Sequence, residues 1–194
     1  WATFDLVEKY LSGATCSGLW EAKLANMKPW EVHTYSPAYK DDEIDEIADI
    51  SDKVIFNSFN QLLKYQDRVK NKAKIGIRIN PEVSSSPVPL YDPCAVFSRM
   101  GVTKKNFRGD LLENVSVLHF HTLCEQDTKP LIKVLEGVEE KFGEYLHQME
   151  WVNFGGGHHI TRDDYDVDEL IKIIKNLPTP FDTDNLQTSP LPLL

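Results

Sequence analysis

Segments with helical spacing of apolar residues alternate with short runs of β-branched and aromatic residues along most of the chain. The helical segments place apolar side chains three or four positions apart, at residues 4–11, 17–26, 41–49, 61–70, 130–142 and 167–176. The short runs are expected strands, at residues 14–16, 31–35, 53–56, 74–80, 115–120 and 149–154. Regular alternation of strand and helix predicts an α/β fold.

Strands joined by helices run parallel and have both faces covered, which leaves an open doubly wound sheet or a (β/α)8 barrel. A dinucleotide-binding sheet carries its glycines after the first strand. Here the glycine run, residues 155–157, follows the sixth expected strand. Because a late phosphate site is typical of barrels, we expect a (β/α)8 TIM-type barrel, incomplete at about six strands, over residues 1–176.

Two segments stand outside the alternation. Residues 84–102 contain three successive serines and three prolines, and this stretch is too long for an ordinary connection, which favours a functional loop or lid. Residues 177–194 are rich in proline where another strand is due, and we expect this tail to be disordered or extraneous. The chain also begins within a helical pattern that lacks an N-cap. Truncation of a longer barrel is the expectation that accounts for both ends.

Composition and charge narrow the class of ligand. The 194 residues are 41% hydrophobic and 26% charged, as in an average globular domain, and the net charge is −9. This acidic balance argues against broad binding to nucleic acid or anionic membranes and favours a small-molecule ligand. With no apolar run of about 18 residues and no signal-peptide pattern at the start, the chain is expected to be cytoplasmic.

The candidate chemistry starts at residues 151–159, an apolar run that ends in Gly155, Gly156 and Gly157. Three adjacent glycines let backbone N–H groups approach an anion, so this turn is either a phosphate site or a tight connection without a ligand. The three cysteines are widely spaced, which indicates neither a disulfide framework nor a zinc site. No histidine pair has the helical spacing of a zincin, so no metal site is expected.

Seven collinear segments resemble one enzyme family. They are residues 15–21 (TCSGLWE), 33–37 (HTYSP), 56–58 (FNS), 78–81 (RINP), 97–101 (FSRMG), 119–125 (HFHTLCE) and 151–159 (WVNFGGGHH). In this order and spacing they closely resemble the carboxynorspermidine decarboxylases. These enzymes of polyamine biosynthesis depend on pyridoxal 5'-phosphate (PLP) and share the alanine racemase-like barrel of ornithine and diaminopimelate decarboxylases.

The resemblance implies roles for individual residues. Gly155, Gly156 and Gly157 match the loop whose amides hold the cofactor phosphate, and His121 matches the histidine that stacks on the pyridine ring. Arg78 matches a strand arginine near the cofactor, and Cys124 falls where related decarboxylases place a small hydroxyl residue near the phosphate. The alternatives are a core histidine, a structural ion pair for Arg78, and an inert buried cysteine.

Other family features are missing from the sequence. The resemblance implies a Schiff-base lysine on a strand before residue 4, so no catalytic residue is assigned. A Glu-Pro-Gly-Glu strand and the C-terminal β domain, which completes the active site across a homodimer, are not found either. We therefore expect decarboxylase ancestry but no activity for this chain alone. A noncatalytic phosphate-binding or interaction fragment, or another decarboxylase of this fold such as diaminopimelate decarboxylase, remains open, and carboxynorspermidine is not separated from carboxyspermidine.

Overall fold

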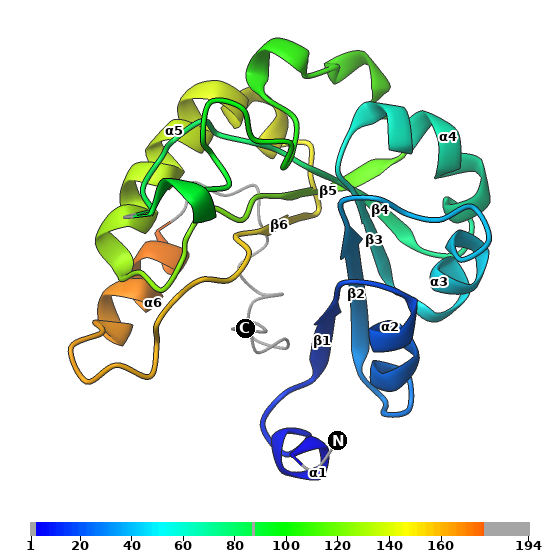
Figure 1. The fold of residues 1–194 in the computed structure, drawn as a ribbon, viewed down its shortest axis with the longest axis horizontal. Helices are drawn as coiled ribbons and strands as arrows, with labels where there is room; N and C mark the ends of the chain where they lie inside the picture. The colour runs from blue at the N-terminus through cyan, green and yellow to red at the C-terminus, as the bar shows by residue number, and fades with distance from the viewer. Residues whose placement is uncertain (1–2, 87, 177–194) are drawn as a thin grey trace.

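A computed structural model describes residues 3–86 and 88–176, so the predicted tail at 177–194 lies outside the described residues. Six strands form one sheet in the order of the chain: β1 (Gly13–Cys16), β2 (Glu31–Ser36), β3 (Lys53–Phe56), β4 (Lys74–Arg78), β5 (Val115–His119) and β6 (Trp151–Asn153). Every neighbouring pair is parallel. The sheet curves around an interior, with the helices along its outer side (Figure 1). The predicted α/β barrel architecture, with six strands of it present, is confirmed.

Four helices connect successive strands: α2 (Leu19–Ala25), α3 (Ile44–Ile50), α4 (Phe59–Val69) and α5 (Thr128–Leu146). The helix α1 (Phe4–Val7) precedes β1 and α6 (Val167–Lys175) follows β6, while the described part of the segment between β4 and β5 contains three short 3-10 helices and no α-helix. Side chains cap the N-termini of three α-helices, because Ser58 accepts from the amide of Gln61, Asp127 from Lys129 and Asp166 from Glu169. The boundaries differ modestly from the expected ranges. For example, α5 is longer at both ends and α1 stops after one turn. Across the described residues, no helix combines the length and apolar character needed to cross a membrane.

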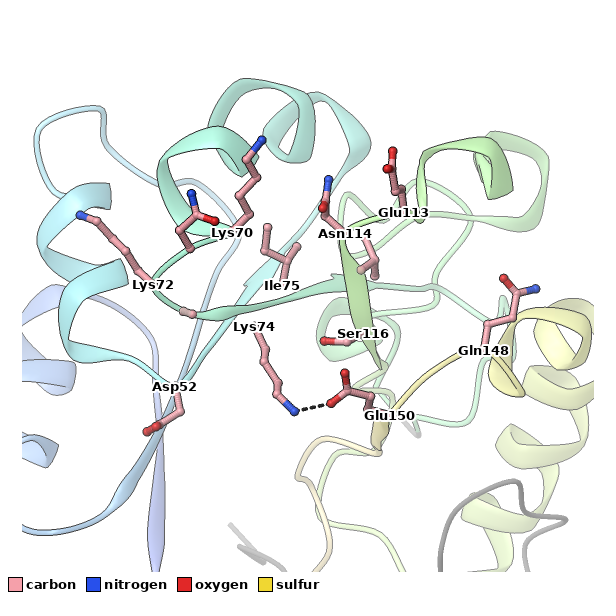
Figure 2. A pocket seen from close by; sticks show the side chains of 13 residues that line it. Asp52, Lys70, Lys72, Lys74, Ile75, Glu113, Asn114, Ser116, Gln148 and Glu150 are labelled. Atoms are coloured by element: carbon pink, nitrogen blue, oxygen red, sulfur yellow. Dashed lines mark hydrogen bonds and ion pairs between the residues drawn. The ribbon is translucent and has the colours of Figure 1, made fainter.

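The N-terminal edge of strands β3 to β6 carries a polar depression of about 620 Å³ (Figure 2). Its lysines are already paired: Lys74 with Glu150, Lys70 with Asp67 and Lys72 with Asp49. Ligand sites of (β/α) barrels lie at the opposite, C-terminal edge of the strands. We therefore assign this depression no ligand.

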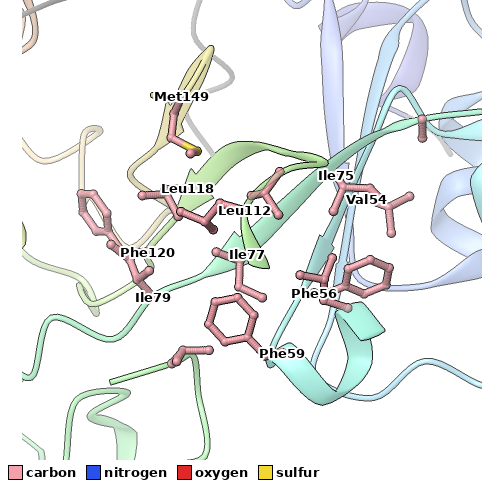
Figure 3. Close-up of a cluster of buried hydrophobic side chains, with 14 of the residues drawn as sticks. Val54, Phe56, Phe59, Ile75, Ile77, Ile79, Leu112, Leu118, Phe120 and Met149 are labelled. Carbon is pink, nitrogen blue, oxygen red and sulfur yellow. The ribbon is translucent and has the colours of Figure 1, made fainter. Parts of the chain in front are cut away.

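The hydrophobic core fills the layer between the sheet and the helices. Val54 and Phe56 of β3, Ile75 and Ile77 of β4, and Leu118 of β5 are each at most 2% exposed (Figure 3). Side chains alternate across a strand, so the residues between them face the barrel interior. These inner positions carry an unusual number of polar residues: His33, Tyr35, Lys53, Arg78 and His119.

One glycine on the inner face is required by packing. A Cβ on Gly76 would lie 2.8 Å from the Cδ1 atom of Ile55 and 2.9 Å from the Cβ atom of Val117, on the two neighbouring strands. Such a contact is too short for any side chain, so β4 needs glycine at this level. The interior is thus closely packed midway along the strands, between polar groups at the two ends.

Candidate functional site

The C-terminal ends of β2, β4, β5 and β6 gather the predicted site residues at one edge of the barrel. The register places Arg78 opposite His119, and His119 opposite Asn153. The ring of His119 lies 5.4 Å from that of Tyr35 and 6.4 Å from that of His121, measured between centroids. Polar and aromatic groups from four strands therefore meet where a parallel barrel places its active site.

Arg78 is a buried cation for which the described residues supply no anionic partner. Arg78 is 3% exposed. Its NH1 donates to the hydroxyl of Tyr35 at 2.7 Å and its NH2 donates to the carbonyl of His121 at 2.9 Å, while its Nε has no partner among the described residues. No carboxylate in the described part of the chain forms an ion pair with it, so the alternative of a structural ion pair is not found. A buried charge held only by neutral acceptors is costly, and an anionic ligand would offset that cost.

Two histidines beside Arg78 are kept neutral. His119 is 5% exposed, and burial, followed by the charges of Arg78 and of protonated His121, lowers its pKa to about 3. His121 is less buried, and its pKa is lowered by burial first, then by Arg78 and His158. Both rings are consequently uncharged at neutral pH. His121 is partly exposed, which distinguishes it from a fully enclosed core histidine.

The glycine loop packs directly against the chain that leaves β5. Gly155 and Gly157 have φ angles of +71° and +89°. A Cβ on Gly155 would lie 2.6 Å from the carbonyl oxygen of Phe120, and one on Gly157 would lie 2.1 Å from that of Leu123. Backbone geometry alone therefore requires glycine at these two positions, whether or not a ligand is bound.

The amides of the loop divide into engaged and available groups. The N–H of Gly155 donates to Oδ1 of Asn153 at 2.7 Å, so one of the three predicted phosphate donors is already used. Among the described residues no partner is found for the N–H groups of Gly156, which is buried, and Gly157. Gln126 fixes the far side of the loop, because its N–H donates to the carbonyl of Gly157 at 3.0 Å and its carbonyl accepts from His159 at 3.1 Å. The loop thus offers two adjacent amides to an anion.

Cys124 lies next to this loop but makes no side-chain contact that defines a role. It is a free, partly buried cysteine whose N–H donates to Oε1 of Gln126 at 3.3 Å. The preceding residue, Leu123, is the one whose carbonyl approaches Gly157. Cys124 is therefore placed near the predicted phosphate seat, and its contact with a ligand stays a prediction.

Sequence reasoning missed three members of the site. Tyr35 and Asn57 were part of motifs without a role, and Asn153, which directs the Gly155 amide, was not singled out. Tyr35 donates to Oδ1 of Asn57 at 2.8 Å and accepts from Arg78. The available signal was the alternation of polar residues in β2, which puts Tyr35 on the inner face, two positions beyond His33.

A second polar cluster lies on the inner face near the N-terminal ends of the strands. The amine of Lys53, which is 3% exposed, donates to Glu31 and lies 2.9 Å from Nε2 of His33 and 3.8 Å from the centroid of the Trp151 ring. The hydrogen bond with His33, and then Lys53, lower the pKa of Glu31 to about 2, against the opposing effect of burial. Lys53 is therefore a structural cation whose charge is balanced by the carboxylate of Glu31, and its amine is engaged in these contacts. The described residues contain no group of three potential metal ligands.

The architecture is that of the PLP-dependent decarboxylases with alanine racemase-like barrels. It superposes on diaminopimelate decarboxylase from Helicobacter pylori, complexed with L-lysine, with a TM-score of 0.72 over 91% of this chain and 51% of that one. At 18% identity this likeness shows the fold alone.

A solved structure of higher identity narrows the relationship. Carboxynorspermidine decarboxylase from Campylobacter jejuni, complexed with norspermidine, superposes with a TM-score of 0.82 at 46% identity, covering 90% of this chain and 45% of that one. The carboxynorspermidine/carboxyspermidine decarboxylases of Campylobacter jejuni and Herminiimonas arsenicoxydans are 50% and 36% identical over 91% and 94% of this chain. The chain is thus a homologue of these decarboxylases, which confirms the predicted resemblance.

The remaining comparisons qualify this relationship. Carboxyaminopropylagmatine decarboxylase of Synechocystis sp. is 42% identical over 88% of this chain. The chain spans about half the length of the curated relatives it matches, from 45% to 50%. No protein-family model matches the chain.

Proposed function

We propose that this chain forms part of a PLP-dependent carboxy-lyase that decarboxylates carboxynorspermidine or carboxyspermidine in polyamine biosynthesis. The observation that carries the proposal is the buried Arg78, which has no carboxylate partner among residues 3–86 and 88–176, beside His121 and the glycine loop. The homologous decarboxylases give this anion-binding edge its chemical context.

The residues present fit PLP, which combines a flat aromatic ring with a doubly charged phosphate. The unpaired amides of Gly156 and Gly157 would hold the phosphate, with Cys124 beside them, and neutral His121 would lie against the ring. Arg78 would supply a positive charge to the ligand, because no carboxylate in the described part of the chain balances the charge of its guanidinium. When bound, PLP supplies an electron sink for the charge left on the substrate carbon after carbon dioxide departs.

The side chains of this edge have binding and orienting roles in the proposal. Neutral His119 and His121 add no positive charge, so Arg78 remains the cation that sets the local potential. Oδ1 of Asn153 accepts the N–H of Gly155, so this amide does not face the phosphate in the proposal. The same hydrogen bond would help to orient the amides of Gly156 and Gly157. We assign no catalytic proton transfer to any described residue.

Residues 1–176 are the cofactor-binding barrel segment in this proposal, and residues 177–194 lie outside the described residues. A homodimer, a cationic polyamine-type substrate and a cytoplasmic location complete it. These three points rest on the resemblance and on composition.

Cofactor binding is tested by titrating the chain with PLP and following absorbance, with inorganic phosphate as the competitor. We expect saturable binding that phosphate weakens, because the phosphate group occupies the glycine loop. Absence of saturable binding, or binding that phosphate does not affect, would contradict the proposed site.

Substrate choice is tested on the complete enzyme of which this chain is proposed to form part, by measuring carbon dioxide release from carboxynorspermidine, carboxyspermidine and carboxyaminopropylagmatine side by side. The third compound is the competing candidate, because a relative 42% identical is named for it. Preference for it over the other two would replace the proposed substrate while leaving the reaction class intact.

A further inference from the structure

We infer that Tyr35 and Asn57 are positioning residues that hold the guanidinium of Arg78 and couple it to residues 99–101. The inference deepens the proposed function and rests on it, because that function gives Arg78 its anionic ligand. Neither Tyr35 nor Asn57 is assigned a contact with the ligand.

Tyr35 is the side chain that orients Arg78. Its hydroxyl accepts from NH1 of Arg78 at 2.7 Å and donates to Oδ1 of Asn57 at 2.8 Å. The Cζ atom of Arg78 also lies 4.9 Å from the centroid of the Tyr35 ring. The other hydrogen bond of the guanidinium within the described residues goes to a backbone carbonyl, that of His121. The position of this cation across the site therefore depends on the position of one phenol.

Asn57 fixes the phenol and joins it to a distant segment. Its Oδ1 accepts from Tyr35 and from the N–H of Gly101, the latter at 2.8 Å, and its Nδ2 donates to the carbonyl of Arg99 at 2.8 Å. Its backbone N–H donates to Oε1 of Gln61 at 2.8 Å, which anchors it at the start of α4. One amide side chain thus links β2, the end of β3 and the segment that returns to β4.

That returning segment also touches Arg78 directly. Gly101 has a φ angle of +82°, and a Cβ there would lie 2.8 Å from the carbonyl oxygen of Ile79 and 3.1 Å from Cγ of Arg78. The next residue, Val102, donates its N–H to the carbonyl of Arg78 at 2.8 Å. Residues 99–102 therefore contact the stem of Arg78, while Asn57 and Tyr35 hold its charged end, so a shift of this segment is transmitted to the guanidinium.

The chemistry of the relay suits a cation that must keep its charge for a ligand. Burial raises the pKa of Tyr35, and the nearby charge of Arg78 opposes this effect without reversing it, so the phenol stays neutral. A carboxylate at this place would orient Arg78 equally well but would cancel its charge. Tyrosine followed by an amide gives orientation without neutralisation.

A nearby tyrosine provides a matched control. Tyr39 is 9% exposed, and within the described residues its hydroxyl bonds backbone groups alone, namely the carbonyls of Thr34 at 2.9 Å and Ile55 at 3.0 Å and the N–H of Ser36 at 3.2 Å. Tyr35→Phe and Tyr39→Phe each remove one phenol hydroxyl, at neighbouring places in the fold. Only the first of these variants changes a contact of Arg78.

The test compares both variants with the wild-type chain by PLP titration and by site-resolved hydrogen exchange. Tyr35→Phe should raise the Kd for PLP about tenfold, equivalent to about 1.4 kcal/mol, and should accelerate exchange of the Gly101 amide. Tyr39→Phe should lower thermal stability while leaving the Kd within about twofold and the Gly101 exchange unchanged. Equal effects of the two variants on Kd and exchange, or no effect of Tyr35→Phe, would overturn the inference.

Two further measurements keep the inference testable if the first variant or the proposed function fails. If Tyr35→Phe does not fold, Asn57→Ala should show the same two effects and Asn60→Ala, an exposed asparagine of α4, neither of them. If the wild-type chain binds no PLP, the proposed function fails. Two measurements on the ligand-free chain then still decide whether Tyr35 and Asn57 position Arg78. They are the hydrogen exchange of the Gly101 amide and the NMR resonances of the His121 ring, each compared between the wild-type chain and the variants.

Discussion

Replacing Arg78 by methionine should cost no stability while it weakens the binding of an anionic ligand. The guanidinium donates two hydrogen bonds to neutral acceptors. Hydrogen bonds from a charged group contribute about 1.5–3 kcal/mol each, so their loss costs roughly 3–6 kcal/mol. Against this stands the desolvation of a nearly fully buried cation, which costs several kcal/mol after relaxation. No ion pair with a described carboxylate offsets it.

The balance is worked from this comparison. Exchange of a buried charged group for an apolar side chain of similar volume ranges from neutral to stabilising by about 1–4 kcal/mol. In Arg78→Met the carbonyl of His121 and the hydroxyl oxygen of Tyr35 each lose a donor, while Tyr35 keeps the hydrogen bond that it donates to Asn57. We therefore expect the free energy of unfolding to stay the same or to rise by up to about 3 kcal/mol.

The assay is urea unfolding at neutral pH without ligand, read as a change of midpoint at constant slope. Arg108→Met is the control, because Arg108 is exposed and pairs with Asp110 two residues away, and its effect should stay within about 0.5 kcal/mol. PLP affinity of Arg78→Met should fall at least tenfold. A loss of stability above about 1 kcal/mol would show that the folded chain compensates the charge of Arg78, and would refute the reasoning.

Three other perturbations test separate parts of the structure. Stability should begin to fall as the pH drops below about 6.5, because His119 has a folded pKa of about 3 and the unfolded chain binds a proton that the folded chain excludes. In urea unfolding measured at several pH values, His119→Asn should reduce this early loss of stability. Glu31→Gln should destabilise by about 2 kcal/mol at pH 7, a value discounted because Glu31 is 35% exposed, and Glu31→Gln with Lys53→Met should recover most of it in thermal unfolding. Gly157→Ala should cost at least about 2 kcal/mol and abolish PLP binding, since its Cβ would meet Leu123; a folded variant with unchanged Kd would contradict the loop assignment.

The elements that were predicted well are those that local periodicity encodes. All six strands lie where short runs of β-branched and aromatic residues occur, because both faces of a parallel sheet are covered and its strands are correspondingly apolar. The ends of the strands were predicted less accurately than their positions in the chain. The fourth strand was expected to reach residue 80 but stops at Arg78, after which Ile79 pairs with Val102 in a single bridge and donates its N–H to the carbonyl of His119.

The site was only partly predictable, because its contacts depend on register across the sheet. Gly155 and Gly157 stand in a segment whose composition already indicated a turn after a strand, whereas His121 was singled out only through the family resemblance. Tyr35 and Arg78 are 43 residues apart, and their hydrogen bond depends on how β2 and β4 are placed on the two sides of β3. The role of Asn153 was hidden for a different reason. Its side chain bonds an amide two residues on, a local contact that occupies one of the donors expected to bind phosphate.

The two buried cations of the inner face distinguish the two ends of the barrel. Lys53 and Arg78 are each 3% exposed and lie on adjacent strands. Lys53, near the N-terminal ends, is neutralised by Glu31, whose pKa is lowered to about 2. Arg78, at the C-terminal ends, is met by a phenol and a carbonyl. Because both cations carry a similar desolvation cost, the lack of a counter-charge in the described part of the chain is specific to the C-terminal end, and an anionic ligand is the partner that would supply it.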